Sequence, residues 1–227
     1  MNTKNTKSNN KAIFKKQKYV KVDSGLTSET IDLITQYALF DEMQRYTPEG
    51  SELNRNNQVP GAHSRYADPM MESLLSYLQP VVEKNTGLSL YPTYSYYRVY
   101  RPGDELKPHK DRPACEISIT ISFKFDYLNK KYDWPIFVDN NSINMNPGEM
   151  VIYRGCELEH WREKFEAEDG SWHVQAFLHY VDANGENANQ KWDGRSSLGS
   201  IIDRSGNVAA PVSLNQSVKK SYIEFTK

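Results

Sequence analysis

The sequence has few cysteines and no long hydrophobic run. Only Cys115 and Cys156 stand in 227 residues, which is too few for a fold held together by disulfides. No apolar run approaches the roughly 20 residues that cross a bilayer. The first stretch, MNTKNTKSNNKAIFKKQK, lacks the apolar core of a signal peptide. We therefore expect a reduced, cytoplasmic protein with no membrane partner.

Neither sign of charge is in excess, because 28 lysines and arginines face 29 acidic residues. No net field draws nucleic acid to the chain. Outside residues 1–18 no basic stripe interleaved with aromatic residues is present, so a nucleic-acid partner is not expected. Residues 1–18 carry six lysines and are predicted to be a disordered basic tail. Residues 183–227 are polar and predict a mobile tail or a lid.

The folded domain is predicted to span residues 19–182 and to begin with a helical part at 27–87. One helix is expected at 27–46 and another at 70–87, where apolar residues recur on one stripe. The stripe consists of Met71, Leu74, Leu75, Leu78 and Val82. Between the helices, residues 47–69 have the glycine, proline and asparagine content of a loop.

From residue 91 to 182 the pattern changes to β structure. The run 115–126 alternates, with Ile117, Ile119, Ile121, Phe123 and Phe125 on one face and polar residues, including Lys124, on the other. Several short strands with turns between them are typical of a sandwich or barrel. The helices would then cover the outside of a sheet. Further strands are expected at 19–23, 91–102, 134–139, 149–154 and 171–182.

The short motif PHKDRP places His109 and Asp111 two residues apart. At strand spacing both side chains point to one face, so a nitrogen and an oxygen can meet at one ion. Of the downstream histidines His160, His173 and His179, we favour His160 because it follows a strand and a short loop, GCELEH. Two histidines and one carboxylate are diagnostic of non-haem Fe(II) oxygenases. A thiolate zinc site is disfavoured because the cysteines form no CxxC pair.

The segments RVYRPGDELKPHKD and PGEMVIYRGCELEHWRE resemble the 2-oxoglutarate- and Fe(II)-dependent oxygenases, in the branch near prolyl hydroxylases. The resemblance covers roughly residues 91–182. It implies an α+β fold, a double-stranded β-helix or jelly roll with N-terminal helices packed on the outside of the sheet. It also implies that His109, Asp111 and His160 bind Fe(II), with 2-oxoglutarate and O2 as cosubstrates, and it allows for ascorbate.

The sequence departs from this family at the residue that anchors 2-oxoglutarate. The family usually places an arginine about ten residues beyond the second histidine, but EAEDGSWHVQAF contains no arginine or lysine. The buried carboxylate still needs a cation. Arg162, two beyond His160, is slightly preferred over Lys124, which matches a lysine in the asparaginyl-hydroxylase branch. Tyr100 resembles the tyrosine that the family places on the carboxylate, and Arg98 shares its face.

The resemblance implies hydroxylation of a protein residue, such as proline, or of a small molecule, with release of succinate and carbon dioxide. Two alternatives remain at this point. One is a cupin-like metal enzyme without 2-oxoglutarate, and the other is a non-catalytic jelly-roll interaction protein. The loop 47–68 and the segment from 183 are expected to choose the substrate. The sequence leaves the substrate and the oligomeric state open.

Overall fold

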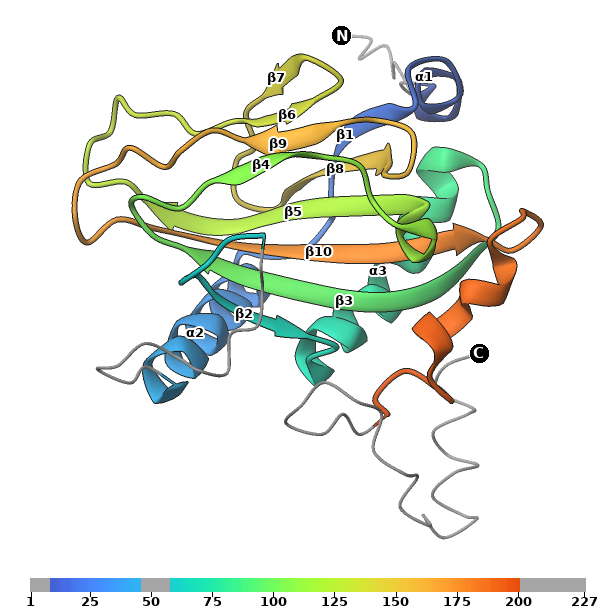
Figure 1. Ribbon diagram of the computed structural model, residues 1–227, viewed down its shortest axis with the longest axis horizontal. Coiled ribbons are helices and arrows are strands. Elements are labelled where there is room, and N and C mark those ends of the chain that lie inside the picture. Colours follow the sequence, from blue (N-terminus) through green and yellow to red (C-terminus); the bar gives the residue numbers. More distant parts are fainter. Residues whose placement is uncertain (1–8, 46–57, 201–227) are drawn as a thin grey trace, which may run out of the picture.

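The computed structural model describes residues 9–45 and 58–200, which form two antiparallel sheets (Figure 1). The larger sheet has the order β1-β8-β5-β10-β3-β2 and the smaller sheet the order β4-β9-β6-β7. The strands of the larger sheet are β1 (Tyr19–Asp23), β8 (Glu149–Arg154), β5 (Ile117–Asp126), β10 (Trp172–Asp182), β3 (Leu90–Tyr100) and β2 (His63–Tyr66). Those of the smaller sheet are β4 (Leu106–His109), β9 (His160–Arg162), β6 (Ile136–Val138) and β7 (Asn141–Ile143).

The two sheets face each other and enclose a shared interior. Leu106 of the smaller sheet packs in one cluster with Tyr100 and Phe177 of the larger sheet. Ile136 and Val138 of β6 pack in a second cluster with residues of β8. Strands distant in sequence therefore become neighbours, as β4 and β9 do. This arrangement confirms the predicted α+β jelly roll.

Two helices, α2 (Ser28–Arg45) and α3 (Pro69–Thr86), cover the outer face of the larger sheet (Figure 1). The start of α3 is fixed by Asp68, whose side chain accepts hydrogen bonds from the amides of Met70 and Met71. Gly87 ends the helix in the left-handed conformation, with φ of 79°. The predicted stripe is buried, and each such side chain contributes about 1.5–3 kcal/mol. The stripe comprises Met71, Leu74, Leu75, Leu78 and Val82.

Strand β5 lies near the centre of the larger sheet, so both of its faces are buried. Its isoleucines join the main core beneath the helices, while Ser118, Thr120 and Ser122 are also fully buried. A β-bulge then interrupts the alternation, because Val174 pairs with Lys124 whereas Gln175 pairs with Ser122. Beyond the bulge every side chain changes face. The predicted placement of Phe125 with the isoleucines is therefore wrong.

Residues 10–17 form a helix, α1 (Asn10–Gln17). The Asn9 side chain accepts a hydrogen bond from the amide of Ala12, and Lys18 ends the helix in the left-handed region. Phe14 is only 2% exposed and packs into the main core. The prediction of a disordered tail over 1–18 is thus wrong from residue 10 onward, because one buried aromatic side chain holds the lysine-rich segment on the domain. Residues 1–8 lie outside the described part.

The segment after β10 is also ordered as far as residue 200. It contains a 3₁₀ segment, η2 (Ala188–Gly194), which lies against β3. The buried guanidinium of Arg195 then lies 2.5 Å from the carboxylate of Glu72 on α3. A mobile tail is therefore wrong for 183–200, because a buried ion pair fixes it. Residues 201–227, and the first half of the expected loop at 47–68, fall outside the described ranges. The described half contains the strand β2, so a loop is wrong for His63–Tyr66.

Within those ranges, both cysteines are free thiols. None of the helices there combines the length and the apolar character that a membrane span requires.

Candidate metal centre

Three predicted ligands meet where the two short strands β4 and β9 pair. His109 ends β4, His160 begins β9, and the two residues are direct partners across the antiparallel ladder. Asp111 follows His109 by two positions and directs Oδ1 toward both rings. Its Oδ1 lies 3.8 Å from Nε2 of His109 and 3.6 Å from Nε2 of His160. All three ligand atoms lie within 4.8 Å of one another, close enough to share one metal ion.

Backbone carbonyl groups orient both imidazole rings. Nδ1 of His109 lies 2.8 Å from the carbonyl oxygen of Lys107, and Nδ1 of His160 lies 3.1 Å from that of Leu158. A carbonyl oxygen can only accept, so each Nδ1 carries the proton and each Nε2 keeps its lone pair for a metal. Burial, together with the neighbouring His160, lowers the pKa of His109. The neutral, metal-binding form is therefore favoured.

The carboxylate of Asp111 is held at its second oxygen. Ser118 donates a hydrogen bond to Oδ2 at 2.7 Å, which leaves Oδ1 for an ion. Burial alone would raise the pKa of Asp111, but the electrostatic influence of His160 and the hydrogen bond donated by Ser118 hold it below its ordinary value. The backbone amide of Asp111 also donates to the carbonyl of Gly155 at 2.9 Å. That bond joins the Asp111 segment to the loop that leads into His160.

Gly155 is a site residue that the sequence analysis missed. A Cβ at this position would collide with the Asp111 carboxylate and would lie 2.5 Å from the carbonyl oxygen of Cys115 and 2.7 Å from Oγ of Ser118. Only a glycine leaves room for the carboxylate here. The available signal was its place between the strand EMVIYR and the loop that ends at His160.

A second possible ligand group combines Asp111 with Cys115 and His179. The thiol of Cys115 hydrogen-bonds the Tyr94 hydroxyl at 3.0 Å, and burial raises its pKa. It stays a thiol, which is a poor metal ligand. His179 Nδ1 lies 3.0 Å from Oγ of Ser118. This group therefore supports the Asp111 carboxylate rather than a second ion.

The triad opens onto a cavity of about 270 Å³ between the sheets. Its wall is mostly aromatic, with two guanidinium groups, and Asp111 is the only carboxylate among its lining residues in the described part of the chain. Besides the triad, the residues that line this cavity include Tyr66, Tyr94, Tyr96, Arg98, Arg112 and Phe177.

Two buried cations lie in the interior beside Gln175. Arg98 is the register partner of Gln175 on the adjacent strand, and Arg162 donates to Oε1 of Gln175 at 2.7 Å. Both guanidinium groups are 1% exposed, and no carboxylate in residues 9–45 and 58–200 forms an ion pair with either. Nε of Arg98, Nε of Arg162 and the amide nitrogen of Gln175 have no hydrogen-bond acceptor. A small dicarboxylate would satisfy these donors.

Two further residues, Tyr100 and Lys124, were predicted to hold 2-oxoglutarate. The position of Tyr100 fits this role and that of Lys124 does not. Tyr100 accepts a hydrogen bond from Nη1 of Arg98 at 2.9 Å, so it belongs to this basic region. Lys124 is turned by the β-bulge toward the helices, where its ammonium pairs with Asp32 of α2. The prediction that Lys124 could anchor 2-oxoglutarate is therefore wrong. Arg98, which lines the cavity itself, fits better than the sequence suggested.

The fold is shared with solved oxygenase structures at low sequence identity. A prolyl hydroxylase from Trichoplax adhaerens, in complex with a hypoxia-inducible-factor peptide fragment, is 10% identical with a TM-score of 0.58, over 82% of this chain and 90% of that chain. The carbocyclase SnoK of nogalamycin biosynthesis is 14% identical with a TM-score of 0.59, over 79% and 85%. EctD from S. alaskensis with 2-oxoglutarate and 5-hydroxyectoine is 13% identical with a TM-score of 0.54, over 78% and 76%.

Neither protein-family models nor curated protein sequences match the chain. The structural likeness establishes the architecture, which is that of the 2-oxoglutarate- and Fe(II)-dependent oxygenases. The sequence resemblance points to the same class, and the converging ligands of the triad fit it.

Proposed function

We propose that this protein is a 2-oxoglutarate- and Fe(II)-dependent oxygenase that hydroxylates a protein residue, such as proline, or a small molecule. The observation that carries the proposal is the preorganised triad of His109, Asp111 and His160, whose free ligand atoms face one point at the cavity. Similar structures were solved with a peptide fragment and with 5-hydroxyectoine, so both substrate classes are compatible with this fold.

The donor set suits Fe(II) better than a structural metal. Three protein ligands on one side of an ion leave positions for other ligands, whereas closed sites use four. When bound, Fe(II) with 2-oxoglutarate and O2 supplies an oxidation in which decarboxylation to succinate and carbon dioxide accompanies substrate hydroxylation. The chain's own contribution is to fix the ligands, to exclude water with the aromatic wall and to position the substrate.

The buried guanidinium groups explain how the protein would hold 2-oxoglutarate. A buried cation without a counter-charge is costly, and a carboxylate on Arg98 and Arg162 would remove that cost. The amide nitrogen of Gln175, which is buried without an acceptor, would add a further donor. We assign the distal carboxylate of 2-oxoglutarate to these three side chains, with Tyr100 orienting Arg98.

Two observations weigh against the alternatives. A cupin-like enzyme without an oxo acid gives no reason for two unpaired buried arginines. A non-catalytic interaction protein gives no reason for carbonyl groups that aim both Nε2 atoms at the Asp111 carboxylate.

Anaerobic calorimetry with Fe(II), followed by 2-oxoglutarate, tests the proposal. The wild-type protein should bind the metal and then the oxo acid, and His160→Ala should lose both. His63→Gln is the matched control, because His63 pairs with Asp41 on the helix side of the sheet. Metal binding without 2-oxoglutarate binding would favour the cupin-like reaction. Failure of the wild-type protein to bind metal would favour the interaction protein.

A further inference from the structure

The cavity holds a carboxylate-binding arrangement that the metal and the oxo acid do not use. Arg112 donates two parallel hydrogen bonds to Asp193, Nη1 to Oδ1 at 2.6 Å and Nη2 to Oδ2 at 2.7 Å. The Tyr66 hydroxyl donates to Oδ2 of the same carboxylate at 2.6 Å. Both donors, Arg112 and Tyr66, line the cavity above the metal ligands. Two residues of the cavity wall therefore bind one of the chain's own carboxylates, although Asp193 itself does not line the cavity.

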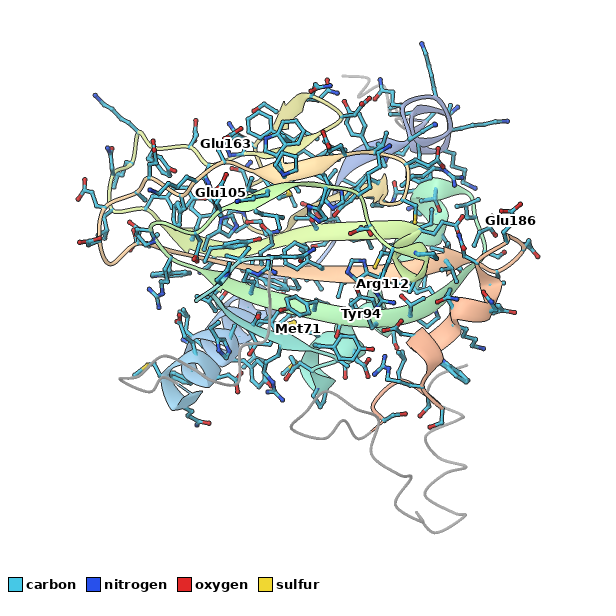
Figure 2. All side chains as sticks on the ribbon, in the orientation of Figure 1. Met71, Tyr94, Glu105, Arg112, Glu163 and Glu186 are labelled. Atoms are coloured by element: carbon cyan, nitrogen blue, oxygen red, sulfur yellow. The ribbon has the colours of Figure 1, made fainter. Side chains whose placement is uncertain are left out.

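Arg112 does not depend on Asp193 for its position. It directly follows the metal ligand Asp111, and its guanidinium carbon lies 4.7 Å from the ring centroid of Tyr94, beside which it lies in Figure 2. An arginine on an aromatic face keeps its planar fork free for a carboxylate. The fork would stay over the cavity if Asp193 moved away.

The segment that carries Asp193 is held in an unfavourable backbone conformation. Two consecutive residues other than glycine, Trp192 and Asp193, have φ of 59° and 55°, the left-handed region that side chains disfavour. Strain of this kind persists only where surrounding contacts impose it, and it gathers at sites that bind or switch. The Arg112 side chain is 49% exposed and the Asp193 side chain 13%, so solvent reaches the ion pair from the arginine side. A second carboxylate can approach the guanidinium of Arg112 from that side.

The size and charge of the cavity limit what could replace Asp193. A volume of about 270 Å³ lies below the roughly 300–1,000 Å³ of sites for drug-sized ligands, and 2-oxoglutarate would take part of it. Tyr94 lines this cavity beside Arg112, and Tyr96 and Phe177 line it beside Arg98. The remaining space fits a small molecule with one carboxylate and a compact apolar part.

We propose that Arg112 and Tyr66 bind the carboxylate of a small substrate of amino-acid size, and that Asp193 occupies this subsite until the substrate displaces it. The inference rests on the proposed oxygenase function and selects a small carboxylate over a peptide segment. When the substrate binds, its carboxylate replaces that of Asp193 on the guanidinium of Arg112, so the subsite selects for a negatively charged group. Binding also releases the strained turn at Trp192 and Asp193.

The test uses the full chain with Fe(II) and 2-oxoglutarate, and the probes are the standard L-amino acids, each as the free acid and as its primary amide. Succinate release is measured for every probe. At least one free acid should stimulate release at a concentration about tenfold lower than its amide, as expected for a lost charge-assisted pair. Arg112→Gln should raise the KM for that acid about tenfold and abolish the difference between acid and amide. The KM of Arg112→Lys for the same acid should lie between those of the wild-type protein and Arg112→Gln.

Asp193→Asn provides the decisive comparison, because it removes the internal competitor. The proposal expects a lower KM for the acid, opposite in direction to Arg112→Gln. If the ion pair only clamps the segment, both substitutions should raise KM together, and the proposal is overturned. Lys15→Gln is the control, since Lys15 is exposed on α1, away from the cavity, and the substitution should change nothing.

Two further outcomes would overturn the inference without touching the oxygenase assignment. One is equal stimulation by acids and amides. The other is no stimulation by any acid in either the wild-type protein or Asp193→Asn, while calorimetry without a probe still shows Fe(II) and 2-oxoglutarate binding. Loss of that binding in the wild-type protein would instead contradict the proposed function itself.

Discussion

Ser118 donates its hydroxyl hydrogen to Oδ2 of Asp111 at 2.7 Å, while its oxygen lies 3.0 Å from Nδ1 of His179. The bond occupies one carboxylate oxygen and leaves the other facing the two histidines. The geometry of the metal ligand is therefore set by a serine on the central strand of the larger sheet. Groups that orient a ligand in this way commonly account for a tenfold to hundredfold change in metal affinity.

Ser118→Ala should accordingly weaken metal binding by about 10- to 100-fold, because the freed carboxylate can rotate. Calorimetric titration with Fe(II) under anaerobic conditions measures the change. Ser122→Ala is the matched control on the same strand, since Ser122 bonds His173 instead. Both variants should lose about 1 kcal/mol of unfolding free energy. Equal metal affinities in the two variants would contradict the role of Ser118.

Gly155→Ala should abolish metal binding and also lower the unfolding free energy, because its Cβ would lie 2.5 Å from the carbonyl oxygen of Cys115. The added methyl group would displace the Asp111 carboxylate and crowd Ser118. Gly25→Ala serves as the comparison, because Gly25 has φ of 76° with open space around its Cβ position. That substitution should cost about 1 kcal/mol of stability through backbone strain alone and should leave metal affinity unchanged. Thermal unfolding and metal titration of both variants separate the two effects.

Arg98→Gln and Arg162→Gln should each reduce 2-oxoglutarate affinity about tenfold or more, because a hydrogen bond to a charged group is worth about 1.5–3 kcal/mol. Lys124→Gln should bind 2-oxoglutarate as the wild-type protein does, since Lys124 pairs with Asp32 on the other side of the sheet. Titration of the Fe(II)-loaded proteins with the oxo acid distinguishes the variants. A loss confined to Lys124→Gln would contradict the assignment.

The stability of the metal-free protein should fall as the pH drops from about 6.5 to 4. Burial lowers the pKa of His179 to about 4, compared with about 6.5 in an unfolded chain. Between these values the unfolded state binds more protons, so acid favours unfolding. The contribution is up to about 3 kcal/mol, at 1.36 kcal/mol for each pKa unit.

His179→Gln isolates this contribution and keeps a donor for Ser118. Its unfolding free energy, measured by urea denaturation across the same pH range, should depend less on pH than that of the wild-type protein. His173, whose pKa burial also lowers, would retain part of the wild-type slope. An identical slope in both proteins would show that His179 is solvated or charged in the folded state.

Sequence reasoning located the ligands because their geometry is local. His109 and Asp111 are two residues apart, and His160 follows the predicted strand EMVIYR by one short loop, although the strand β9 that it begins was not predicted. It failed at Lys124 because a bulge depends on pairing between β5 and β10, which no local pattern reports. It also underestimated Arg98, since only the folded register sets that residue beside Gln175.

The order of residues 10–18 and 183–200 shows the same limit. Phe14 is one of few apolar side chains in a lysine-rich segment, and composition alone does not report its burial. Arg195 likewise pairs with Glu72 only after α3 has packed on the sheet. Both segments were predicted from their average polarity, whereas specific contacts with the domain set their order.

The two arginines beside Gln175 would make the proposed oxo-acid site a contributor to folding stability. A buried cation without a counter-charge is costly, and an anion bound there would bind the native state but not the unfolded chain. Its concentration would therefore enter the folding equilibrium directly, as any native-state ligand does.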